Sequence, residues 1–165
     1  MLRSPTLSVF GLVALLAGCG QSVEHAELGR QFVLAEEPSE ILGIVDYHEA
    51  ETKPTDVSLI GRIGFKNLKW SSQSAMFLLV DPAEALEGGG HVCHDENCPF
   101  CKGKKGANQS QAIVMLVGDD GQVPPIDARK LLPLEEGQTA VVSGRAEIDE
   151  AGQLVLHARG VYVRR

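Results

Sequence analysis

The sequence has few aromatic residues, no excess of positive charge and no apolar run long enough to cross a membrane. Aromatic residues make up 5% of the 165 residues, which argues against a surface on which bases or sugars stack. The net charge of −7 gives the protein no general attraction to phosphate backbones or anionic membranes, so we expect no nucleic-acid partner. The sequence also lacks a serine nucleophile elbow and a phosphate-cradling glycine loop, and an enzyme is therefore unsupported.

The amino terminus has the organisation of a secretory signal. Arg3 precedes the apolar run Val9 to Ala17, which is about nine residues long where a spanning helix needs roughly twenty. Leu16-Ala17-Gly18-Cys19 resembles the lipobox of bacterial lipoproteins. The resemblance implies that residues 1–18 are cleaved, that Cys19 is lipidated, and that several acyl chains hold the protein on a membrane. Gly20 after the cysteine favours the outer membrane. The alternative is an ordinary secretory signal with a chance cysteine.

Two segments precede the predicted domain. Residues 19–37 are mixed and mostly polar, which predicts a lipidated tether. Residues 38–56 form a helical lead-in, because Ile41, Leu42 and Val45 have rough helical spacing and Ser39 can cap the helix.

Five strand patterns and one short helix follow over residues 57–165. The segments Val57–Phe65 and Gly137–Ile148 alternate apolar or small residues on one face, including Ile148. The other strands are predicted at Ala75–Asp81, Gln111–Val117 and Leu154–Val163, with a short helix at Pro125–Leu132. We therefore predict an all-β fold with short helices.

The element order is three strands, a helix and a hairpin of two long strands. This order is typical of the OB-fold, a five-stranded Greek-key barrel; another small barrel or a sandwich is the alternative. Gly61-Arg62-Ile63-Gly64 and Gly144-Arg145-Ala146 through Tyr162-Val163-Arg164 also resemble uncharacterised bacterial OB-like lipoproteins. That resemblance covers Val57 to Arg165 and implies no activity.

A Cys/His-rich loop, residues 82–110, is inserted between predicted strands 2 and 3. Three cysteines and two histidines lie within eleven residues: His91, Cys93, His94, Cys98 and Cys101. Cys98-x-x-Cys101 has the spacing of a zinc knuckle, and Cys93 with one histidine would complete a tetrahedral Cys3His set. We prefer His91 as the fourth ligand, with His94 as the alternative, because His94 is adjacent to Cys93. Thiolate-rich ligation favours zinc, Cu(I) or an iron–sulfur centre.

Two other interpretations of the loop stay open. Cys98-Pro99-Phe100-Cys101 resembles the CPxC dithiol of thioredoxin-like proteins, although Gly103 and Gly106 oppose the helix that lowers the thiol pKa there. In an oxidising compartment a structural disulfide can form instead, and it would leave one of the three cysteines over.

These patterns lead to three hypotheses about function. The first is a non-enzymatic binding module of the cell envelope, extracytoplasmic and lipid-anchored, whose loop binds zinc. The second is a thiol redox or metal-handling protein that uses the Cys98/Cys101 pair. The third is a plain interaction domain with a structural disulfide. The sequence does not identify an envelope-protein or small-molecule partner for any of them.

Overall fold

The computed structural model describes residues 20–64, 70–82 and 109–164 of the chain. Three short elements come first: α1 (Gly20–Arg30), β1 (Leu42–Gly43) and α2 (Ile44–Glu49). The remaining elements are β2 (Asp56–Ile63), β3 (Met76–Val80), β4 (Gln111–Leu116), α4 (Ala128–Leu131), β5 (Thr139–Ile148) and β6 (Leu154–Val163). The prediction of a mostly β fold with short helices is confirmed.

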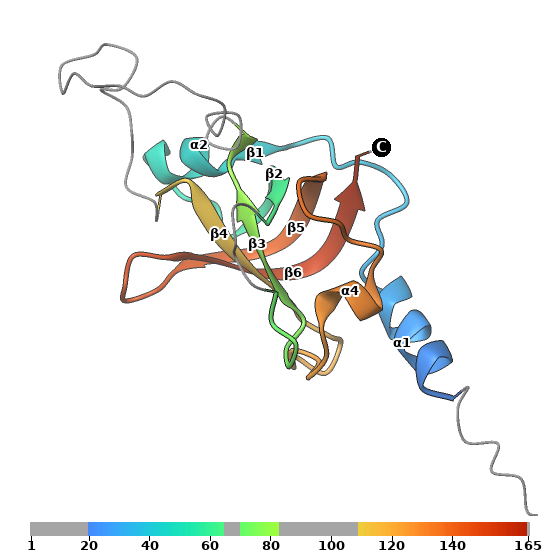
Figure 1. The fold of residues 1–165 in the computed structure, drawn as a ribbon. Helices are drawn as coiled ribbons and strands as arrows, with labels where there is room; N and C mark the ends of the chain where they lie inside the picture. The colour runs from blue at the N-terminus through green and yellow to red at the C-terminus, as the bar shows by residue number, and fades with distance from the viewer. Residues whose placement is uncertain (1–19, 65–69, 83–108, 165) are drawn as a thin grey trace, which may run out of the picture.

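The strands form one sheet that curls back on itself (Figure 1). Its order is β1-β2-β3-β4-β6-β5, and β5 pairs with β2 in addition, so the pairings lead from β2 around to β2 again. The β4–β6 pairing is parallel, whereas the β3–β4, β5–β6 and β2–β5 pairings are antiparallel. Only two residue pairs join β2 to β3, Arg62 with Val80 and Ile63 with Leu79. The sheet has six strands where five were predicted, because β1 adds to β2 in parallel.

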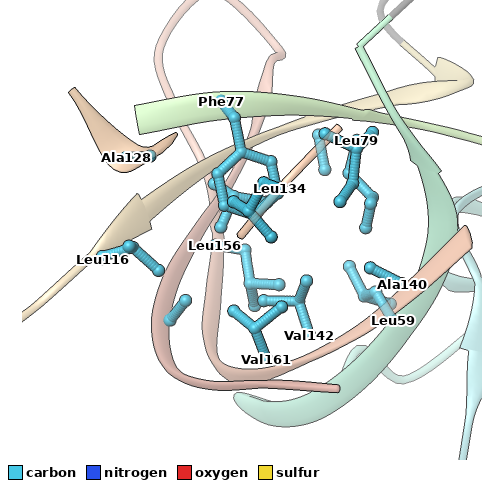
Figure 2. Close-up of a cluster of buried hydrophobic side chains, with 14 of the residues drawn as sticks. Leu59, Phe77, Leu79, Leu116, Ala128, Leu134, Ala140, Val142, Leu156 and Val161 are labelled. Carbon is cyan, nitrogen blue, oxygen red and sulfur yellow. The ribbon is translucent and has the colours of Figure 1, made fainter. Parts of the chain in front are cut away.

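Alternation of side chains explains why these segments form strands with one buried face. In β4, Ala112, Val114 and Leu116 are fully buried while the residues between them are half-buried, as expected when successive side chains point to opposite faces. Figure 2 shows the inward side chains of several strands meeting in one cluster, with Phe77 and Leu156 near its centre. The core therefore fills the space enclosed by the curled sheet.

The predicted inward face of residues 137–148 ends earlier than expected. Ala140, Val142 and Ala146 are buried, but Ile148 is 41% exposed. Ile148 is the last residue before the turn that begins at Asp149, whose carboxylate accepts hydrogen bonds from Ala151 and Gln153. The strand thus extends beyond the core, and Ile148 at its end is exposed although it continues the alternation.

Residues 19–37 were predicted to form a tether, but from Gly20 onward the segment is folded onto the domain. Residues 20–30 form α1, and Phe32 is 1% exposed. At Gly29 a Cβ atom would lie 1.9 Å from the carbonyl oxygen of Leu131, so α1 and α4 are in close backbone contact. Phe32 and Leu34 then bond to Val161 of β6 through their backbones. Few apolar residues make these contacts. The segment is therefore mostly polar in sequence, although it packs on the domain.

The predicted helical lead-in over residues 38–56 is shorter than expected. The helix α2 begins at Ile44, and its N-cap, Gly43, has an extended backbone because it belongs to β1. Ile44 and Tyr47 are the buried residues of this helix. The lead-in is therefore a short strand followed by a single helix of six residues.

Gly144 fixes the close approach of β5 and β6, and Gly144→Ala is expected to destabilise the protein by about 2–3 kcal/mol. A Cβ atom there would lie 2.2 Å from the carbonyl oxygen of His157, and backbone cannot yield as a side chain can. Chemical denaturation followed by the fluorescence of Trp70, the single tryptophan, measures the loss. Gly118→Ala is the control, since the nearest atom to its Cβ would be a carboxylate oxygen of the Asp120 side chain at 2.9 Å, and the nearest backbone atom lies at an ordinary contact distance of 3.6 Å. Equal losses in the two variants would contradict the prediction.

Candidate functional site

The structure fixes the two ends of the Cys/His loop at neighbouring strand ends. Val80, the last residue of β3, pairs with Gln111, the first residue of β4. One residue farther out, the backbone N–H of Asp81 donates to the carbonyl oxygen of Ser110 at 2.8 Å. Asp81 and Ser110 are 6% and 3% exposed. The loop therefore leaves and re-enters the sheet at one buried point.

Asp81 also joins this loop base to α2. Its carboxylate accepts a hydrogen bond from the backbone N–H of Val45, in the first turn of α2, at 3.2 Å. Figure 1 shows α2 beside the ends of β3 and β4 from which the loop departs. This role of Asp81 was not predicted from the sequence, where the residue stands at the end of a predicted strand. A carboxylate directly after a buried strand is the signal that could have indicated it.

The residues predicted to carry function all lie outside the described residues. They are the lipidation residue Cys19, the proposed metal ligands Cys93, Cys98 and Cys101, and the alternative fourth ligands His91 and His94. The structure defines the base of the Cys/His loop, at Val80–Asp81 and Ser110–Gln111. The set of metal ligands stays a prediction.

A small apolar hollow of about 180 Å³ lies on the outer side of β3 and β4. We call it the Trp70 hollow; its lining is Gly64, Trp70, Ser71, Met76, Phe77, Leu78 and Ile113. The rings of Trp70 and Phe77 lie 6.0 Å apart, tilted by 36°. The guanidinium of Arg129 lies 5.1 Å from the centre of the Trp70 ring, within the range of a cation–π interaction. Sequence reasoning missed this hollow, because its residues come from separate segments.

Asp127 holds Arg129 over the tryptophan ring. Its carboxylate accepts from Nε of Arg129 at 3.0 Å and from Nη2 at 2.6 Å, and it also accepts from the backbone N–H of Arg129 at the start of α4. The side-chain hydrogen bond from Arg129 holds the pKa of the Asp127 carboxyl below its usual value, although burial acts in the opposite direction. A bidentate pair of this kind restrains a guanidinium in both position and plane.

Asp127→Asn is expected to lower the free energy of unfolding by about 1 kcal/mol at neutral pH, through loss of the charged cap and the ion pair. Because the folded pKa is depressed, this stabilisation is complete above the ordinary carboxyl pKa of 3.8 and is lost as the pH falls through the folded value. Thermal unfolding across pH measures the effect: the difference between wild type and variant should shrink below pH about 4. Glu136→Gln is the exposed control; a difference that stays constant into acid would contradict the prediction.

A groove of about 800 Å³ lies where β2 and β5 close the sheet, with Ser39–Leu42 on one wall. At its floor the hydroxyls of Ser58 and Ser143 are 2.7 Å apart, and the two residues are cross-strand partners. This hydrogen bond links the side chains of β2 and β5, the two strands whose pairing closes the sheet. The lining includes the carboxylates of Glu40 and Asp56.

His157 lies on the outer surface of β6. Its Nε2 is 3.0 Å from a carboxylate oxygen of Glu147 on β5, and both side chains are at least one-third exposed. Within residues 20–64, 70–82 and 109–164, no group of three or more His, Cys, Asp or Glu side chains is arranged to hold a metal ion. In that same part of the chain, no helix has the length and apolar character needed to cross a membrane.

Comparison with known proteins assigns no family. No protein-family model matches the sequence, and no curated protein matches it. Among solved structures, one similar chain is described as an aspartyl-tRNA synthetase from Leishmania major Friedlin, with 10% identity and a TM-score of 0.39. The match covers 80% of this chain but only 22% of that one. A likeness this distant assigns neither a fold nor a function.

Proposed function

We propose that this protein is a lipid-anchored, non-enzymatic binding module of the cell envelope whose Cys/His loop binds zinc or another thiophilic metal. The observation that carries the proposal is the closed base of the loop. Since Asp81 and Ser110 are hydrogen-bonded and buried, the chain between them starts and ends at one point on a packed sheet. Three cysteines and two histidines within such a loop have the composition and spacing of a tetrahedral zinc set.

The proposed scaffold is an OB-fold-like barrel. Its support is the strand order of β2 to β6, in which β4 pairs with β6 in parallel and β5 pairs back to β2, together with α4 between β4 and β5. In OB-folds the barrel and its loops serve as a binding platform. The Trp70 hollow, lined by residues of β3 and β4 and by Gly64, Trp70 and Ser71, is the place on this platform where an apolar group of a partner would fit.

The proposed anchor is a lipid on Cys19, and α1 begins at the next residue, Gly20. Because α1 packs on α4 and Phe32 is buried, the barrel would sit close to the bilayer. The lipobox resemblance and the glycine after the cysteine support an envelope location, with the outer membrane favoured.

Elemental analysis of the protein purified under reducing conditions tests the metal site. Near-stoichiometric zinc is the expected result, because thiolate ligation outcompetes water for this ion. Metal-free protein whose thiols are reduced would overturn the proposal. In that case a reactive Cys98/Cys101 pair, detected by exchange with a small disulfide, would favour the redox alternative.

A further inference from the structure

A second hollow, of about 460 Å³, lies where β5, β6, the segment after α1 and the turn after β4 meet. We call it the arginine hollow. Its lining is Gln31, Phe32, Val117, Gly118, Asp119, Gly121, Arg145, His157 and Arg159. The volume is in the range of small-molecule sites. Phe32, which is 1% exposed, gives it an apolar wall beside the polar groups.

Three basic residues line this hollow, and one of them, Arg159, also lines the groove between β2 and β5. Arg145 on β5 and His157 on β6 are direct cross-strand partners. The register then shifts: Gly144 is opposite Ala158, whereas Ser143 is opposite Gly160, so Arg159 is the extra residue of a bulge. Bulges re-aim side chains and are frequent beside functional sites. Arg159 shares the outer face with His157 through the ordinary alternation of β6, and the bulge shifts the alternation only after Arg159.

Carboxylates pair with two of the three basic groups of the hollow, Arg159 with Asp56 and His157 with Glu147. Arg145 is the exception, although Asp56 is its cross-strand partner. Across the described part of the chain, Arg145 has no ion pair. Arg159 lies 3.5 Å from Asp56, but both side chains are more than 70% exposed, and such surface pairs are weak. The donors of the Arg145 guanidinium are therefore available to an anion, and Arg159 can exchange its exposed contact with Asp56 for one.

We propose that the arginine hollow binds the oxyanion group, carboxylate or phosphate, of a small molecule, with Arg145 and Arg159 as the donors. Guanidinium groups match both anions through two parallel hydrogen bonds. Asp119 lines the same hollow and repels excess negative charge, so the ligand presents a hydroxyl or amine at that end. The Glu147 carboxylate holds the ring of His157 at 3.0 Å. This site goes beyond the proposed function and does not involve the Cys/His loop.

Titration of the full chain in detergent micelles tests the proposal, with acetate, inorganic phosphate and chloride added at matched ionic strength. The readouts are the side-chain N–H signals of Arg145 and His157 in NMR spectra. Acetate or phosphate is expected to shift both signals saturably, and chloride is not. A tighter response to acetate assigns a carboxylate ligand, and a tighter response to phosphate assigns a phosphate ester.

Substitutions then separate the site from general charge effects. Arg145→Gln and Arg159→Gln are each expected to weaken binding about tenfold, as loss of a charge-assisted hydrogen bond does, whereas Arg145→Lys weakens it less. Arg62→Gln on β2 removes the same charge outside the hollow and should change nothing; unchanged Trp70 fluorescence verifies that each variant is folded. Equal responses to chloride, or unchanged affinity in both Arg145→Gln and Arg159→Gln, would overturn the proposal.

Discussion

Replacing Cys19 with serine is expected to abolish incorporation of labelled palmitate and to move the protein from the detergent phase to the aqueous phase in phase partitioning. A hydroxyl does not replace the thiol that accepts the diacylglycerol in lipoproteins. Because each acyl chain contributes about 0.8 kcal/mol per buried CH2 group, loss of all the chains removes the anchor entirely. The apolar run Val9 to Ala17 is too short to span a bilayer in its place.

A matched substitution elsewhere distinguishes lipidation from a general effect of losing a cysteine. Cys98→Ser removes a thiol from the Cys/His loop and should leave palmitate incorporation and phase partitioning as in the wild type. A wild type that incorporates no palmitate would contradict the lipid anchor and favour an ordinary secretory signal. Palmitate that persists in the Cys19→Ser variant would contradict Cys19 as the lipidated residue.

An anchor at Cys19 also has a consequence for the position of the domain. The helix α1 (Gly20–Arg30) starts at the following residue, and 11 residues of helix extend only about 16 Å. Its last turn is in backbone contact with α4 through Gly29. With no long flexible spacer after α1, the end of the barrel that carries α4 would face the membrane.

The strands could be predicted because their signal is local. In β2, Leu59, Gly61 and Ile63 alternate with more exposed residues, and a period of two needs no knowledge of the partner strand. The same pattern located β5, except at Ile148, where the end of the core and not the alternation decides burial. The ends of a strand and of its buried part depend on the neighbouring elements in space, and these cannot be identified from the local sequence.

The features that could not be predicted all depend on contacts between distant segments. Phe32 is buried only because β6 lies beside it and Val161 bonds to its backbone. Asp81 is buried at the loop base because α2, 36 residues earlier, offers the N–H of Val45. Arg145 and His157 line one hollow because β5 and β6 pair in the register that makes these two residues partners. None of these contacts follows from a motif, whereas the Cys/His loop has one, and so the sequence could indicate its chemistry but not its geometry.

Replacing Cys98 and Cys101 together by serine is expected to reduce the zinc content from near one ion per chain to near zero. The pair supplies two of the four proposed ligands, with Cys93 and His91, and two remaining ligands do not form the closed tetrahedral set of a structural site. Elemental analysis of protein purified under reducing conditions measures the change. His91→Ala and His94→Ala, compared in the same way, identify the fourth ligand by which of them loses zinc.

The control for this loss is Cys19→Ser, which should retain full zinc because it lies outside the loop. Zinc that persists in the Cys98→Ser, Cys101→Ser double variant would contradict the site. The sheet itself is expected to unfold at an unchanged denaturant concentration in the double variant, as followed by Trp70 fluorescence. The reason is that the loop base is closed by backbone pairing of Val80 with Gln111 and of Asp81 with Ser110, and this pairing needs no metal. The metal would therefore organise the binding loop while the sheet supplies the fold.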